Sequence, residues 1–113
     1  MTNCLFCKIV AGEIPSAKVL ENSDYLAFRD IDPKAPVHVL VIPKKHFEDI
    51  AELSKGDNVL TAGLMKFAIE VAEIEKLENG FRIVLNTGQE GGQSVQHVHA
   101  HVLGGRSLTW PPG

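Results

Sequence analysis

Three histidines, His97, His99 and His101, alternate with apolar residues near the end of the chain. In a β-strand successive side chains point to opposite faces, so these imidazoles would share one face while the apolar residues between them pack on the other. Imidazole transfers protons, attacks electrophiles and binds metals near neutral pH. The pattern predicts a chemically active face on a strand over residues 95–103. A metal-binding tract or a fortuitous cluster is the alternative.

A glycine-rich loop, residues 86–94 with the sequence NTGQEGGQS, comes just before these histidines. Paired glycines let backbone N–H groups approach an anion, and a serine hydroxyl stands at the end of the loop. Transfer at a phosphoryl or acyl centre needs such donors beside a nucleophile. The combination indicates group-transfer chemistry, although glycines in a loop often do no more than form turns.

Length and composition restrict the class of protein. The 113 residues suit one domain, residues 1–113, and a chain this short often gains burial by forming a dimer. The formal charge of -3 argues against a general nucleic-acid binder. No apolar stretch approaches the roughly 20 residues that span a bilayer, and the N-terminus does not resemble a signal peptide. We therefore expect a cytoplasmic protein without a membrane partner.

The two cysteines, Cys4 and Cys7, have a Cys-x-x-Cys spacing. In a reducing compartment this spacing favours metal or redox chemistry over a structural disulfide. A thioredoxin-like redox pair would need a strand before it, and only three residues precede Cys4. Metal binding is the favoured interpretation, with a redox pair and idle thiols as the alternatives.

Apolar patterns predict an antiparallel sheet covered by one long helix. Strands are expected at residues 17–20, 25–29, 37–42, 81–86 and 95–103, with a hairpin turn at 22–24. A short helix is expected at residues 5–10 and another near 46–53. The long helix is expected to begin near Ser54 and to end at Asn79-Gly80. The stripe that must cover the sheet is Leu60, Leu64, Phe67, Val71 and Ile74. These elements predict an α+β fold.

Residues 97–103 match, at every position, the pattern His-φ-His-φ-His-φ-φ of the histidine triad (HIT) family, in which φ is apolar. The segments FRDIDP (28–33), HVLVIPK (38–44), GGQS (91–94) and WPPG (110–113) resemble the Hint branch of that family, so the similarity spans essentially the whole chain. The resemblance implies a homodimeric α+β fold. It also implies hydrolysis of purine nucleoside phosphoramidates to a nucleoside monophosphate and an amine.

The resemblance also implies the catalytic residues. His99 would form a nucleotidyl-histidine intermediate, and a neutral imidazole with a pKa of about 6.5 is a fair nucleophile at pH 7. We expect its other ring nitrogen to donate to a backbone carbonyl. His101 would contact the phosphate oxygens, and Ser94 would donate to the phosphate or to the leaving nitrogen. His38 is either a support beside the triad or a buried histidine with a backbone partner, and both readings are compatible.

For the nucleotide, the resemblance implies that the Asp30 carboxylate accepts hydrogen bonds from the ribose hydroxyls. The family pattern assigns the base to an apolar slot, and core packing is the alternative for each of its residues. Asn86 matches a phosphate or sugar contact, Gly92 and Gln93 belong to the phosphate loop, and Trp110 would shape the leaving-group side, from the partner subunit. The slot residues are Leu5, Phe6, Ile9, Phe28, Ile31 and Leu40.

The cysteine pair is similar to a zinc-binding pair in some bacterial HIT proteins, which implies a structural zinc site of Cys4, Cys7, His46 and His97. The chemistry itself asks for no metal. Three other functions stay open: a nucleotide-binding regulatory protein with incidental hydrolysis, a dinucleoside polyphosphate hydrolase, and a nucleotidyltransferase of the same superfamily. A metalloenzyme that uses all three triad histidines as ligands is disfavoured, since His101, Ser94 and the glycine loop would then have no task.

Overall fold

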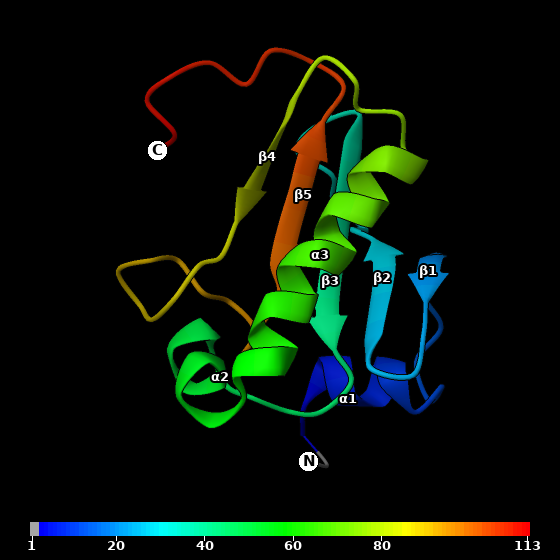
Figure 1. Cartoon of the computed structure of the whole chain (residues 1–113), viewed down its shortest axis with the longest axis vertical. Coiled ribbons are helices and arrows are strands. Elements are labelled where there is room, and N and C mark those ends of the chain that lie inside the picture. Colours follow the sequence, from blue (N-terminus) through cyan, green and yellow to red (C-terminus); the bar gives the residue numbers. More distant parts are fainter. Residues whose placement is uncertain (1–2) are drawn as a thin grey trace.

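Five antiparallel strands form one sheet in the spatial order β1-β2-β3-β5-β4 (Figure 1). The computed structural model describes residues 3–113. The strands are β1 (Lys18–Glu21), β2 (Tyr25–Arg29), β3 (Val37–Pro43), β4 (Phe81–Val84) and β5 (Ala100–Gly104). The helices are α1 (Leu5–Val10), α2 (Ile50–Gly56) and α3 (Asn58–Ile74). The predicted α+β class, with five strands, one long helix and short helices, is confirmed.

The central strand β3 is buried on both faces because a different helix covers each one. Val39 and Val41 belong to the core under α3, which crosses one face of the sheet (Figure 1). Leu40 and Ile42 belong to a second, smaller core under α1. The period of two along the strand thus divides the molecule into two apolar layers.

The α3 layer packs closely around Gly63. A Cβ built on this glycine would lie 2.1 Å from the hydroxyl oxygen of Tyr25. That hydroxyl donates a hydrogen bond to the Leu60 carbonyl at 2.7 Å, so it cannot move without losing its partner. Glycine at position 63 therefore lets the helix approach β2 closely.

The α1 layer is thinner. Phe6 and Ile9 of α1 pack against Phe28 and Leu40 of the sheet. The rings of Phe6 and Phe28 meet edge to face, with their centroids 5.5 Å apart. Since α1 has only six residues, it covers one end of this face and leaves the remainder open.

The predicted hairpin between the first two strands is confirmed. The Asn22 side-chain oxygen accepts hydrogen bonds from the backbone N–H groups of Asp24 and Tyr25, which fixes the turn.

The predicted start of the long helix was wrong. Ser54 lies inside α2, where its hydroxyl donates to the Ala51 carbonyl, so it does not cap α3. The chain becomes extended at Asp57, whose carboxylate accepts from the Leu60 N–H at 2.8 Å and caps α3. Asp57, three residues after the predicted start, therefore caps the long helix. The connector predicted near 46–53 is α2, displaced toward the C-terminus.

The predicted end of the long helix at Asn79-Gly80 was also wrong. Lys76 adopts the left-handed conformation, with φ 57°. Its N–H donates to the Glu73 carbonyl, while the Leu77 N–H donates to the Ala72 carbonyl. This is a Schellman ending, here without the usual glycine. Ile74, predicted to face the core, is 47% exposed at this end.

The last strands are shorter than predicted. β4 ends at Val84, and β5 begins only at Ala100, because Val98 donates its N–H to the Phe47 carbonyl outside the sheet. The alternation still extends back through this segment, since Val98, Ala100 and Val102 all lie in the α3 core. In the described part of the chain, residues 3–113, no helix has the length and apolarity needed to cross a bilayer.

Candidate active site

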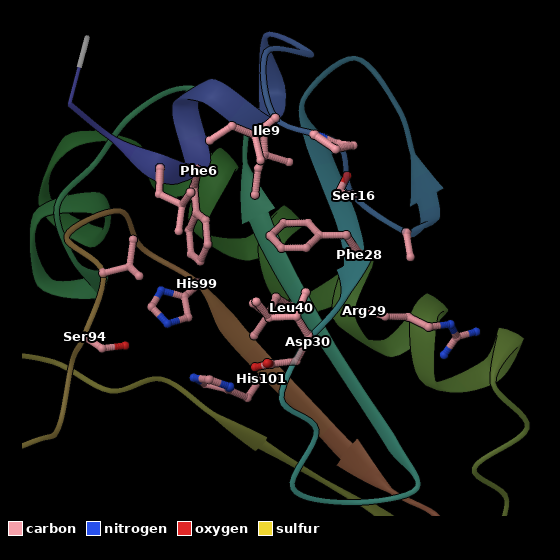
Figure 2. A pocket seen from close by; sticks show the side chains of 16 residues that line it. Phe6, Ile9, Ser16, Phe28, Arg29, Asp30, Leu40, Ser94, His99 and His101 are labelled. Carbon is pink, nitrogen blue, oxygen red and sulfur yellow. The ribbon is translucent and has the colours of Figure 1, made fainter.

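A cavity of about 450 Å³ opens on the α1 side of the sheet, a size suited to a small organic ligand. One end is apolar and lies between α1 and strands β2 and β3, while the other end carries polar side chains (Figure 2). The predicted residues that the cavity brings together are Leu5, Phe6, Ile9, Phe28, Asp30, Ile31, Leu40, Ser94, His99 and His101.

His99 is buried at the polar end, and its ring is held in one tautomer. Its Nδ1 donates to the His97 carbonyl at 2.8 Å, which confirms the expected backbone partner. The edge of the ring meets Phe6 at 5.1 Å between centroids. Burial lowers the pKa of His99 below its ordinary value, so the ring is neutral at pH 7. The Nε2 atom of the neutral ring keeps its lone pair, and His99 lines the cavity.

A chain of hydrogen bonds fixes the tautomer of His101. The Lys34 backbone N–H donates to His38 Nδ1 at 3.0 Å, so a neutral His38 carries its proton on Nε2. His38 Nε2 lies 2.9 Å from His101 Nδ1 and donates to it. A neutral His101 then carries its own proton on Nε2. His38 is both buried and in contact with the triad, so the two readings of this residue hold together.

Burial keeps these two rings neutral. It lowers the pKa of His38 and, together with the neighbouring rings of His99 and His38, lowers the pKa of His101 to about 4. Asp30 acts in the opposite direction, since its carboxylate lies 3.4 Å from His38 Nε2. The other Asp30 oxygen accepts from the Asp32 N–H at 2.8 Å, which orients the carboxylate at the edge of the cavity.

The glycine loop is organised from within. Gln93 is buried, and its Nε2 donates to the carbonyls of Glu48 and Val95 while its Oε1 accepts from the Gly88 N–H. Asn86 donates to the Gly91 carbonyl at 2.7 Å. Neither side chain lines the cavity; both hold the loop that ends at Ser94. Figure 2 shows the Ser94 side chain beside His99 and His101.

Two further predicted residues also lie outside the cavity lining. Gly92 has φ 77°, a conformation that glycine adopts without strain, and shapes the loop. Trp110 is 80% exposed on the C-terminal segment.

The model of the HIT domain family matches residues 11–108. The chain belongs to the HIT family.

Relatives of this HIT protein align over nearly its whole length. An uncharacterized HIT-like protein of Synechococcus elongatus is 48% identical over 109 residues, which cover 96% of each chain. The crystal structure of a HIT family hydrolase from Legionella pneumophila is 52% identical, with a TM-score of 0.94, and covers 98% of this chain and 100% of the other. The crystal structure of a histidine triad nucleotide-binding protein from Candida albicans is 30% identical, with a TM-score of 0.84. The match covers 96% of this chain and 83% of the other.

The first triad histidine has a different environment from the other two. The ring of His97 is fully buried and does not line the cavity. Its Nε2 donates to the Pro43 carbonyl at 2.8 Å, so the lone pair on Nδ1 faces Cys4, Cys7 and His46. The predicted shared face of three imidazoles is thus divided between two sites.

Cys4, Cys7, His46 and His97 are positioned to bind a metal ion, because their four donor atoms all lie within 4.8 Å of one another. The Sγ to Nδ1 distances of 3.3 and 3.5 Å and the Nδ1 to Nδ1 distance of 3.2 Å fit a tetrahedral zinc ion. Zinc bonds of about 2.3 Å to sulfur and 2.0–2.1 Å to nitrogen place such donors roughly 3.3–3.6 Å apart.

The cysteine pair is preorganised by α1. Cys4 is the N-cap of the helix, and its Sγ accepts from the Cys7 N–H at 3.2 Å. Burial, and then the neighbouring Cys4 thiol, raise the pKa of Cys7 to about 11. A metal ion must therefore displace the thiol proton in order to bind.

Sequence analysis missed some of the cavity wall. The irregular segment 14–16 before β1 has no periodicity to mark it, whereas Ala17, Arg29 and Val95 were predicted only as ends of strands. Arg29 forms a two-point ion pair with Glu75 at the end of α3. The missed residues are Ile14, Pro15, Ser16, Ala17, Arg29 and Val95.

Proposed function

We propose that this HIT protein hydrolyses purine nucleoside phosphoramidates through a nucleotidyl-histidine intermediate on His99. The observation that carries the proposal is the neutral His99 ring, whose Nδ1 proton is held by the His97 carbonyl while its Nε2 is free for the cavity. The relatives described as a hydrolase and as a nucleotide-binding protein support the same class of chemistry.

The nucleoside would bind at the apolar end of the cavity. The purine would lie among Phe6, Ile9, Phe28 and Leu40, where aromatic and aliphatic surfaces favour a flat ring system. The Asp30 carboxylate would accept hydrogen bonds from both ribose hydroxyls. Gly92, Gln93 and Asn86 would act indirectly, by holding the loop that ends at Ser94, because the Gly92 and Gln93 N–H groups donate to the Gln89 and Gly88 carbonyls and the Asn86 side chain donates to the Gly91 carbonyl.

In the first step, His99 Nε2 attacks phosphorus. The Nε2–P bond forms as the P–N bond of the substrate breaks, and the electron pair of the broken bond stays on the amine nitrogen. His99 keeps its Nδ1 proton, so the adduct is a cation whose N–H donates a charge-assisted hydrogen bond to the His97 carbonyl. The held tautomer therefore stabilises the intermediate as well as aiming the nucleophile.

The tautomer of His101 decides its part in this step. Because His101 Nδ1 accepts from His38, the neutral ring has only its Nε2 proton and would become an anion on losing it. His101 therefore donates a hydrogen bond to a phosphoryl oxygen without giving up the proton. The proton that the amine requires comes from solvent through the Ser94 hydroxyl, which donates to the leaving nitrogen and is reprotonated by water.

In the second step, water attacks phosphorus from the side that the amine has left. The new O–P bond forms, the Nε2–P bond breaks, and its electron pair returns to His99 while the water releases a proton to solvent. The products are a nucleoside monophosphate and an amine, and the enzyme regains its starting state.

We further propose that Cys4, Cys7, His46 and His97 hold zinc as a structural ion. Four protein ligands would leave no open position for substrate. When bound, zinc would supply a cross-link between the start of α1 and the segment before β5. Metal analysis of protein purified without chelator should find about one zinc per chain, and less than about half an equivalent would reject the site.

We also propose a homodimer formed through β4. In the described residues this edge strand pairs only with β5, and its Phe81 is 40% exposed next to Ile69 of α3. An exposed strand edge with apolar neighbours is suited to pairing with a second copy. Trp110 would then reach the leaving-group side of the partner's site. Sedimentation should give twice the chain mass, and a monomer at micromolar concentration would exclude this arrangement.

The activity is tested with adenosine and guanosine phosphoramidates beside diadenosine polyphosphate. We expect cleavage of the phosphoramidates at a higher kcat/KM, and acid-quenched protein should carry one nucleotide on His99. His99→Gln should abolish both turnover and labelling while it still binds nucleotide. Preferred cleavage of the polyphosphate would reassign the substrate, whereas binding without cleavage would favour a regulatory role.

Asp30→Ala tests the ribose contact, and it should raise KM for ribonucleotide substrates. An unchanged KM would reject the proposed ribose role.

A further inference from the structure

A second cavity, of about 520 Å³, adjoins the nucleotide cavity. Leu5, Ser94 and Val95 line both cavities, so the two meet at these residues. The remaining wall of the second cavity comes from the start of the chain, the segment after β3 and the segment before β5. These residues are Asn3, Cys4, His46, Glu48 and Gln96.

Because Ser94 lines both cavities, its proposed role determines which part of the substrate lies in each one. In the proposed function the nucleoside would fill the first cavity, and phosphorus would lie at its polar end beside His99, His101 and Ser94. Since the Ser94 hydroxyl donates to the leaving nitrogen, the substituent of that nitrogen extends past Ser94. Ser94 also lines the second cavity, so that cavity is within reach of the substituent.

Glu48 gives the second cavity its charge. Among the described residues that line it, Glu48 is the only one with a formally charged side chain. The metal cluster adds no net charge to this cavity. With zinc bound, the two cysteine thiolates offset the charge of the ion, and without zinc the two thiols are neutral. The Glu48 carbonyl accepts from the buried Gln93 Nε2 at 2.7 Å, so Glu48 is tied to the loop that ends at Ser94.

We propose that the second cavity is the subsite for the leaving amine, and that Glu48 selects amines that carry a second positive charge. This inference rests on the proposed phosphoramidase function and names its substrate class: phosphoramidates of diamines or of other amines with a cationic tail. The bonds made and broken at phosphorus are those already given. Glu48 attracts the distal cation and takes no part in proton transfer.

Three phosphoramidates of one nucleoside monophosphate test the inference. Their amines are 1,4-diaminobutane with a cationic tail, butylamine with a neutral tail and 4-aminobutyrate with an anionic tail. We expect kcat/KM to fall in that order, by roughly twofold to fivefold at each step, as for a partly exposed ion pair. The preference should decrease as salt rises from 0.02 to 0.5 M because exposed charges are screened.

Glu48→Gln should reduce the ratio of kcat/KM for the cationic over the anionic substrate to about one. Glu70→Gln is the matched control: it removes the same charge from an exposed position of α3 and should keep the wild-type ratio. A ratio that is the same in Glu48→Gln as in wild type overturns the inference, with the proposed function intact if all three substrates are cleaved. Failure to cleave any of them overturns the proposed function, and the inference with it.

Discussion

His101 should stay neutral at a pH where most histidines are protonated. Burial, followed by the nearby rings of His99 and His38, lowers its pKa from an ordinary 6.5 to about 4, against the opposing charge of Asp30. At pH 5 only about one His101 in ten would carry a second proton, compared with more than nine in ten for a free imidazole. Lowering the pH from 7 to 5 should therefore leave the hydrogen-bonding pattern of this ring unchanged.

The lowered pKa of His101 also makes the free energy of unfolding depend on pH. Between pH 6.5 and about 4 the unfolded chain binds a proton at His101 that the folded chain does not, so the free energy of unfolding falls as pH falls through this window. The full shift corresponds to about 3 kcal/mol, and the partial exposure of the ring reduces this to roughly 1–2 kcal/mol.

NMR titration of ¹⁵N-histidine-labelled protein measures this directly, with the His101 signals assigned by comparison with His101→Gln. The midpoint should lie near 4, and Nδ1 should keep the signature of an unprotonated acceptor down to pH 5. Initial rates, corrected for acid decomposition of the P–N bond, should show no loss from this group above pH 5. A His101 midpoint near 6.5 would refute the burial argument. An Nδ1 that carries a proton at pH 7 would refute the assigned tautomer.

Three further changes test other parts of the structure. His38→Leu removes the donor to His101 and should lower kcat roughly fivefold to tenfold, the worth of one hydrogen bond, with KM nearly constant; a change in KM alone would contradict the tautomer chain. Gly63→Ala should cost about 2–3 kcal/mol in denaturant unfolding, and adding Tyr25→Phe should restore part of it, whereas an equal cost in both backgrounds would reject the close-approach argument. Cys7→Ala should reduce bound zinc to under about half an equivalent while kcat changes less than about threefold, and a loss of turnover with the metal would mean that the ion takes part in the reaction.

The paired strands and the two-sided triad segment could be predicted because their period of two is visible in the residue types. Val98 and Ala100 reached the core as expected, although the strand itself begins only at Ala100. The ends of the helices were harder to predict from the sequence. Ser54 was predicted as the cap from its residue type, but the cap is Asp57, three residues further on, where the backbone becomes extended, and the sequence does not show that conformation. The left-handed Lys76 gives no sequence signal, since Gly80 is the expected stop.

The polar network of the site could not be read from residue types. The support for His38 comes from the backbone N–H of Lys34, and any residue except proline supplies that group. The partners of the His97 ring likewise depend on where Pro43 and α1 lie in space. Sequence identifies which side chains can do chemistry, whereas tautomers follow from the backbone groups that the fold brings to them.

His97 takes part in two sites through separate atoms, its ring in the cysteine cluster and its carbonyl on His99. A substitution of His97 removes the ring but leaves the main-chain carbonyl. Such a substitution therefore affects the attachment of the N-terminal segment more directly than it affects the reaction at phosphorus. The orientation of the His99 ring therefore does not depend on the side chain at position 97. It depends on the position of the main chain there, and a change that moves this backbone would disturb it.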